Sequence, residues 1–114
     1  MERPRIFLKT VTTNETDYST IVDIAISHDA RGISYFSMAI DPDPKALYLI
    51  IIGNFLYEID LELTAVWKLE LPHLTFGIYS GFKAGDRIIV KHKTTDPNTA
   101  VKSSATVAFN EVIG

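Results

Sequence analysis

The chain lacks cysteine altogether, and this absence excludes a disulfide framework. A chain of 114 residues nevertheless buries about 65% of the surface that it exposes when unfolded. A hydrophobic core can therefore hold it together, and we expect a single domain over residues 1–114.

Basic residues are also scarce and scattered. The chain has 11 Lys and Arg against 14 Asp and Glu, for a net charge of −3. This balance argues against a basic surface for nucleic acids. One local cluster exists, Arg87, Lys91 and Lys93, which share a face if the segment is a strand. A solvated strand face is the favoured interpretation of this cluster, ahead of an anion site.

Long apolar runs are missing. Near the amino end only Ile6, Phe7 and Leu8 are consecutive apolar residues, too few for the core of a signal peptide. The longest run, residues 47–52, is interrupted at Gly53, too early for a membrane-spanning helix. We expect no secretion leader and no membrane association. The compartment stays open, with a virion as one setting.

Residues at catalytic or metal-site spacing are absent too. His28, His73 and His92 each stand alone, with no second ligand two or four residues away, so turn or surface positions are expected. Asp41 and Asp43 lack the Asp and Gly ladder of a calcium loop and are typical of a rigid turn. No nucleophile elbow or phosphate-binding glycine loop occurs. We expect a non-catalytic protein without metal or cofactor.

No window keeps a helical apolar period, whereas Ile, Val, Thr, Tyr and Phe alternate between closely spaced turn signals. Strands are expected at 5–12, 20–27, 33–40, 46–52, 55–61, 66–71, 76–79, 87–94 and 104–112. This pattern predicts an all-β fold, an antiparallel sandwich of eight or nine strands in a jelly-roll or other Greek-key order. An immunoglobulin-like order is the alternative.

Two of the turns carry specific expectations. In HDARG, residues 28–32, Asp29 suits a type I turn and Gly32 suits the left-handed position of a bulged hairpin. In DPDPK, residues 41–45, two prolines remove backbone donors and predict a loop.

The most apolar stretch, YLIIIGNFLYEID over residues 48–60, predicts a hairpin. Gly53-Asn54 suits a two-residue primed turn, which requires a positive φ at Gly53. This turn places Ile52 opposite Phe55 and, further out, Tyr48 opposite Ile59. The core face then holds the following residues: Tyr48, Ile50, Ile52, Phe55, Tyr57 and Ile59.

The opposite face of this hairpin carries Leu49, Ile51 and Leu56 beside Glu58 and Asp60. Leaving a Leu or Ile exposed forgoes about 1.5 to 3 kcal/mol, so something should cover the three apolar side chains. The DPDPKA loop, the amino-terminal segment or a neighbouring subunit could do so. Leu49, Ile51 and Leu56 are therefore the predicted interface.

Trp67 shares a strand face with Leu69 and Leu71, which favours a core position. With Tyr35 or Tyr79 it could instead form a sugar-stacking platform.

The leading hypothesis is a non-catalytic structural or interaction protein that works by self-assembly or by binding another protein, as in a virion or phage particle. The alternative is a carbohydrate-binding module, and a weaker one is a small hydrolase whose acids meet only in space. Jelly-roll modules of virion shells, tail structures and lectins share this architecture, which does not fix function.

Overall fold

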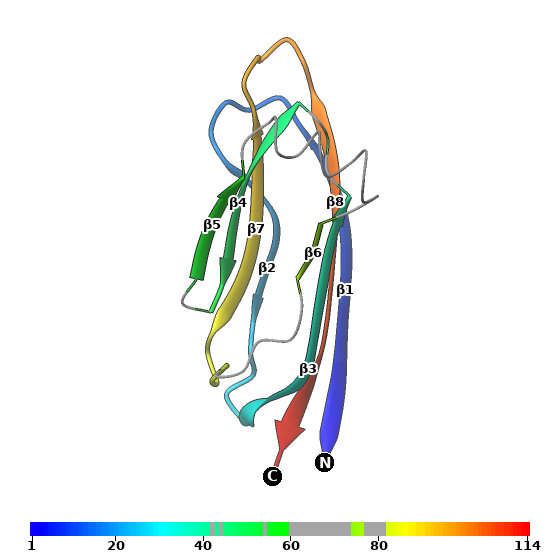
Figure 1. Ribbon diagram of the computed structural model, residues 1–114, viewed down its shortest axis with the longest axis vertical. Coiled ribbons are helices and arrows are strands. Elements are labelled where there is room, and N and C mark those ends of the chain that lie inside the picture. Colours follow the sequence, from blue (N-terminus) through cyan, green and yellow to red (C-terminus); the bar gives the residue numbers. More distant parts are fainter. Residues whose placement is uncertain (42, 44, 54, 60–73, 77–81) are drawn as a thin grey trace.

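Two antiparallel sheets face one another in the computed structural model, which describes residues 1–41, 43, 45–53, 55–59, 74–76 and 82–114 (Figure 1). Its strands are β1 (Glu2–Thr13), β2 (Ser19–Ala25), β3 (Ala30–Asp41), β4 (Ala46–Ile52), β5 (Phe55–Ile59), β6 (Leu74–Phe76), β7 (Arg87–Thr94) and β8 (Val101–Ile113). Sheet A has the order β1-β8-β3-β6, and sheet B has the order β2-β7-β4-β5. The prediction of an all-β fold with two antiparallel sheets is confirmed.

The expected strand limits agree best where turn signals lie on both sides. The ranges 46–52 and 87–94 coincide with β4 and β7. β1, β3 and β8 extend further at both ends than expected, and Pro4 lies inside β1. An edge strand tolerates proline because its missing N–H faces away from the ladder. The expected strand at 66–71, and residues 77–79 of another, lie outside the described residues.

The core lies between the sheets and is built by alternation. The strands direct every second side chain inward, as the period of a β-strand requires. The most buried apolar residues are Phe36, Met38 and Ile40 of β3, Ala46, Tyr48 and Ile50 of β4, Ile88 and Val90 of β7, and Val101, Ala105, Val107 and Phe109 of β8. Each large apolar side chain buried here contributes about 1.5 to 3 kcal/mol.

β2 departs from simple alternation. Val22, Ile24 and Ile26 are buried as expected, but Ile21 is buried as well. The pairing of β2 with β7 shifts between Thr20 and Val22. Such a bulge lets two successive side chains point the same way. The irregularity therefore adds one more isoleucine to the core.

The prediction of a hairpin at residues 28–32 is wrong. β2 and β3 lie in different sheets, so the chain crosses here from sheet B to sheet A. Gly32 lies within β3 at a φ of 151°, next to a shift in the β3–β8 register. A Cβ at this position would lie 3.2 Å from the carbonyl oxygen of Phe82. The glycine serves a close backbone approach rather than a left-handed turn.

The β4–β5 hairpin forms as predicted. Ile52 pairs with Phe55, and Tyr48 pairs with Ile59, with the three pairs between them in the same register. Gly53 has a φ of 59°. Tyr48 and Ile50 are fully buried, which confirms the core face for these two positions. The side chains of the other four residues predicted on this face lie outside the description: Ile52, Phe55, Tyr57 and Ile59.

The DPDPK loop also forms where expected. β3 ends at Asp41 and β4 begins at Ala46. The Asp43 carboxylate accepts hydrogen bonds from the backbone N–H of Lys45 at 2.9 Å and of Lys102 at 3.1 Å.

Within the described part of the chain, no helix has the length and apolar character needed to cross a bilayer.

Candidate interaction surfaces

The outer face of the β4–β5 hairpin carries the predicted interface. Leu49 and Ile51 are half-buried on it. They lie beside Lys91 and Ile89 of β7, their partners in the ladder. Leu56 pairs with Ile51, but its side chain lies outside the description. The structure thus brings the three positions together on one strand pair, and their role as an interface stays a prediction.

The proposed cover of this face by the amino-terminal segment is wrong. That segment is β1, which pairs with β8 in sheet A, so it lies in the other layer (Figure 1). Its sequence suits an edge strand, because charged Arg5 and Lys9 flank Phe7 on the same face. Of the DPDPK loop, Asp43 is bound to Lys102 of β8 and to the Tyr48 hydroxyl. These contacts fix it to β8 and the core.

The basic cluster lies on the outer face of sheet B, as predicted. Arg87 pairs with the Asp23 carboxylate, with 3.1 Å between its Nε and Oδ1. The Lys93 ammonium lies 4.5 Å from the centre of the Tyr18 ring. Exposed contacts of this kind contribute less than about 1 kcal/mol each. Two of the three cations therefore already have partners, which favours a solvated face over an anion site.

The outer face of sheet A carries three of the exposed large apolar or aromatic side chains of the described residues. Ile6 is 74% exposed, Leu8 71% and Tyr35 46%. Register and alternation place them among uncharged neighbours: Pro4 and Thr10 of β1, Ser37 and Ala39 of β3, and Ser104, Thr106, Ala108 and Asn110 of β8. Exposed apolar residues that cluster rather than scatter mark interaction sites. We call this set the sheet A patch.

Tyr35 is the one candidate sugar ligand that the structure describes. It pairs with Asn110 on the sheet A patch, where a hollow of about 290 Å³ has Pro4, Ile6 and Ala108 among its lining. Trp67 and Tyr79 lie outside the described residues, so their expected association with Tyr35 stays untested.

A groove opens between the free edges of the two sheets. β1 and β2 are the first strands of sheets A and B, and a space of about 790 Å³ lies between them. Phe7, Ile21 and Ile24 contribute apolar walls to it, while Arg5 and Lys9 lie along β1. Sheet edges with unpaired backbone groups are templates for pairing with another strand.

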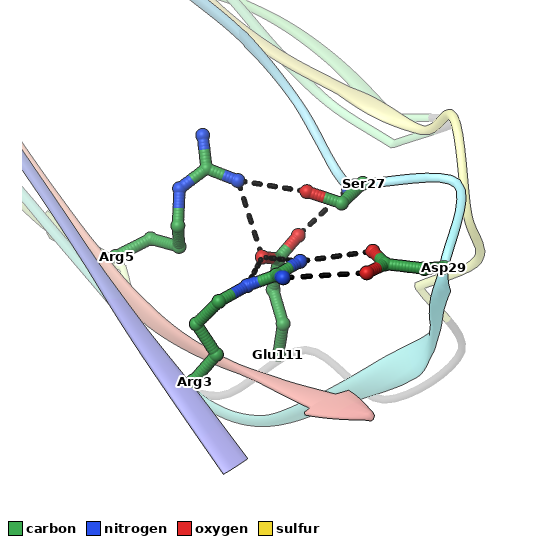
Figure 2. A network of polar contacts seen from close by, with 5 residues as sticks. All are labelled: Arg3, Arg5, Ser27, Asp29 and Glu111. Carbon is green, nitrogen blue, oxygen red and sulfur yellow. Dashed lines mark hydrogen bonds and ion pairs between the residues drawn. The ribbon is translucent and has the colours of Figure 1, made fainter. Parts of the chain in front are cut away.

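Below this groove, the end of the fold that holds both termini is closed by an ionic network (Figure 2). Glu111 of β8 is fully buried. Its Oε1 accepts hydrogen bonds from Arg3 Nη2 at 2.9 Å and from Arg5 Nη1 at 3.1 Å. Its Oε2 accepts the backbone N–H of Ser27 at 2.7 Å. Arg3 also donates hydrogen bonds from Nη1 and Nη2 to the Asp29 carboxylate, so the network joins β1 and β8 to the β2–β3 crossing.

The surroundings of Glu111 favour its ionised form over its protonated form. Burial raises the pKa of Glu111, but the hydrogen bonds from Ser27 and the two arginines outweigh it and lower the pKa to about 2. The Arg5 guanidinium also lies 5.1 Å from the centre of the Phe7 ring and 5.8 Å from that of Phe109. Both arginines are thereby held in place, and Glu111 is charged at neutral pH.

The surface position expected for His92 is wrong. His92 is fully buried in β7, between Tyr48 and Ser103, because Lys91 and Lys93 occupy the outer face and alternation turns His92 inward. Burial lowers its pKa, against the attraction of Asp43. Its Nδ1 bonds Ser103 Oγ at 3.0 Å, whereas its Nε2 has no hydrogen-bond partner. His28 does lie exposed in the β2–β3 crossing.

A serine and a histidine at this spacing resemble a nucleophile and its base. Ser103 is 1% exposed and His92 0%, so a substrate cannot reach either without opening the core. Ser103 also bonds the Tyr48 hydroxyl, whose own pKa burial raises to about 12. The hydrogen bonds therefore link three buried polar side chains, Tyr48, His92 and Ser103, within the core.

Comparisons with known proteins support the fold. No family model matches the chain, and no curated protein matches it. Among solved structures, the protein FLHE is similar at a TM-score of 0.55 and 10% identity, over 96% of this chain and 97% of that one. At so low an identity, the likeness bears on the fold alone.

Two further structures are more distant. The mitogen derived from Yersinia pseudotuberculosis is similar at a TM-score of 0.45 and 14% identity, over 92% of this chain and 86% of that one. A chain of Triatoma virus is similar at a TM-score of 0.38 and 9% identity, over 97% of this chain and 64% of that one. At these scores the two likenesses carry no weight for function.

Proposed function

We propose that the protein is a non-catalytic structural subunit that works by assembling with copies of itself. The observation that carries this proposal is the sheet A patch, where Ile6 and Leu8 stand about three-quarters exposed and have uncharged residues directly beside them on that face. Burying each of them in an interface would contribute about 1.5 to 3 kcal/mol. The half-buried Leu49 and Ile51 on sheet B form a second candidate surface.

The proposal includes a jelly-roll sandwich of eight strands. Support comes from the strand orders β1-β8-β3-β6 and β2-β7-β4-β5, in which the chain changes sheet at every connection except the β4–β5 hairpin and pairs early strands with late ones. Two interlocked Greek keys generate this alternation. An immunoglobulin-like order would keep β1 and β2 in one sheet, so it is disfavoured by the separation of these strands.

A shell or particle is the setting that this architecture favours, because jelly rolls recur in viral capsid proteins. The inference rests on analogy of fold. In its specific form, the proposal is that the protein is a component of a virion or phage particle.

Carbohydrate binding is the second candidate function. The exposed ring of Tyr35, next to Asn110 and the hollow on the sheet A patch, offers a stacking face with an amide beside it. A sugar-binding protein would lose affinity for immobilised glycans on Tyr35→Ala. If Tyr35→Ala leaves retention on immobilised glycans unchanged, this candidate is discarded.

Light scattering tests the assembly proposal. The wild type should show at least twice the mass of one chain at micromolar concentrations. Ile6→Ser with Leu8→Ser, and Leu49→Ser with Ile51→Ser, form two matched double variants. The double change on the surface that mediates assembly should release folded monomer. A monomeric wild type would refute assembly with itself.

A further inference from the structure

The free edge of β1 has a defined hydrogen-bonding pattern. Met1 and Ile113 exchange both backbone hydrogen bonds, at 3.2 and 2.8 Å. Hydrogen-bonded and non-hydrogen-bonded pairs alternate along an antiparallel ladder, and the β1–β8 register continues from this pair without a shift to Thr13. Odd-numbered residues of β1 therefore bond to β8. Even-numbered ones, including Ile6 and Leu8, direct their N–H and C=O groups outward.

The residues whose backbone groups point outward at the edge also carry the exposed apolar side chains. Ile6 and Leu8 present unpaired backbone groups at the edge and exposed apolar side chains on the outer face. Pro4, which has no N–H, also belongs to the outward set, so its missing donor leaves the β1–β8 ladder intact. Among the described strands, β1 pairs with β8 alone. Within the described residues, the twelve-residue strand β1 has no strand on this side, which is what strand addition needs.

We propose that β1 of one copy pairs with β1 of a second copy, antiparallel, about a twofold axis through Phe7. This inference rests on the proposed self-assembly and names the surface and register. The axis places Ile6 opposite the partner's Leu8 as a hydrogen-bonded pair, and the reverse pair follows by symmetry. Four apolar side chains then meet on one face, and the two sheets A become one continuous sheet.

A second copy is the occupant that the edge favours because the edge complements itself. Ile6 and Leu8 are apolar residues on either side of Phe7, so a twofold at Phe7 places apolar side chains opposite apolar side chains. The same axis places the groove between β1 and β2 against the partner's groove. The apolar walls formed by Phe7 and Ile24 would then face another copy of themselves instead of water.

One kind of charge contact, which the twofold repeats twice, opposes this register. On the groove side Lys9 would stand opposite the partner's Arg5, and like charges opposite each other in a ladder are destabilising. Lys9→Glu should therefore tighten the dimer severalfold. Lys83→Glu, an exposed change of equal charge in the loop before β7, should leave the dissociation constant unchanged. Equal effects of both changes would overturn the placement of Lys9.

The absence of native cysteine permits a direct test of register. Ile6→Cys and Leu8→Cys are made in separate chains, both at exposed positions that the fold tolerates. Each variant is treated alone, and the two are mixed, with oxidised glutathione, which accepts the two electrons and two protons that the thiols lose. In a hydrogen-bonded pair the Cα atoms lie about 5.5 Å apart, within reach of a disulfide.

The mixture should form a disulfide-linked dimer of Ile6→Cys with Leu8→Cys, while each variant alone stays unlinked. The two variants have equal masses because Ile and Leu are isomers, so one of them is labelled with heavy nitrogen before mass spectrometry identifies the mixed dimer. Rapid linking of either variant alone would overturn the twofold at Phe7. Ile6→Lys with Leu8→Lys should also raise the dissociation constant roughly a hundredfold, with an unchanged circular dichroism spectrum. An oligomeric wild type that gives no mixed disulfide would overturn this inference and leave self-assembly standing. A monomeric wild type would overturn both.

Discussion

At the scale of single residues, Glu111 is the side chain whose charge matters most to stability. Its carboxylate is fully buried and bonded to Ser27 and two arginines. Glu111→Gln removes the charge that these donors need. We expect a loss of about 2 kcal/mol in the free energy of unfolding at pH 7, since both arginines are part-exposed and screened. Urea denaturation measures it, with the exposed Glu15→Gln as a control.

The same residue predicts a pH dependence. The pKa of Glu111 is lowered from 4.5 to about 2 in the fold, so its stabilisation is present above pH 4.5 and is lost as the pH falls towards 2. The difference in stability between wild type and Glu111→Gln should shrink over that range. A constant difference would show that the carboxylate is not held as described.

His92 acts in a separate pH window. Burial lowers its pKa from 6.5. Below pH 6.5, His92 therefore binds a proton in the unfolded chain more readily than in the folded chain. Stability should fall as the pH drops from 6.5, by at most about 1.4 kcal/mol per pH unit. His92→Phe should flatten this slope, whereas the exposed His28→Asn should keep it. A slope that survives His92→Phe would assign the dependence to another group.

At the scale of elements, the β4–β5 turn depends on a single dihedral angle. Gly53 has a φ of 59°, and a Cβ there would meet Phe82 and Asp86 only at ordinary contact distances, 3.7 and 3.8 Å. The penalty for a side chain is thus one of backbone conformation. Gly53→Val should cost about 1 to 2 kcal/mol, and Gly53→Asn distinctly less. Equal denaturation midpoints for the two variants would contradict this.

Sequence reasoning worked where the information was local. Gly53 fixes the hairpin register, and turn signals on both sides bound β4 and β7. It failed at the β2–β3 crossing, because turn residues such as Asp29 do not encode which sheet the next strand joins. Pairing of β1 with β8 joins the two ends of the chain, and no local pattern announces it.

The functional surfaces show the same division. Leu49 and Ile51 could be placed together because a hairpin fixes its own faces. Ile6 and Leu8 could not, since both faces of β1 carry apolar residues and only burial shows which face is wet. Glu111 was missed although it falls in phase with the inward Val107 and Phe109. An inward charge in a strand is a signal that could have predicted a buried partner.

At the scale of the whole molecule, assembly should couple to stability. If the native form is a dimer, unfolding also dissociates it, and the unfolding midpoint rises with protein concentration. Calorimetry on the wild type should show this rise, and Ile6→Lys with Leu8→Lys should abolish it. A midpoint independent of concentration in the wild type would indicate that the folded unit is a single chain.

Sedimentation equilibrium of the wild type measures the central claim most directly. Runs from low to high micromolar concentration at neutral pH give the mass in solution without any surface or label. Self-assembly predicts a mass that approaches at least two chains, each of 12.7 kDa, as concentration rises. A mass that stays at one chain throughout would contradict the account of this protein as an assembling subunit.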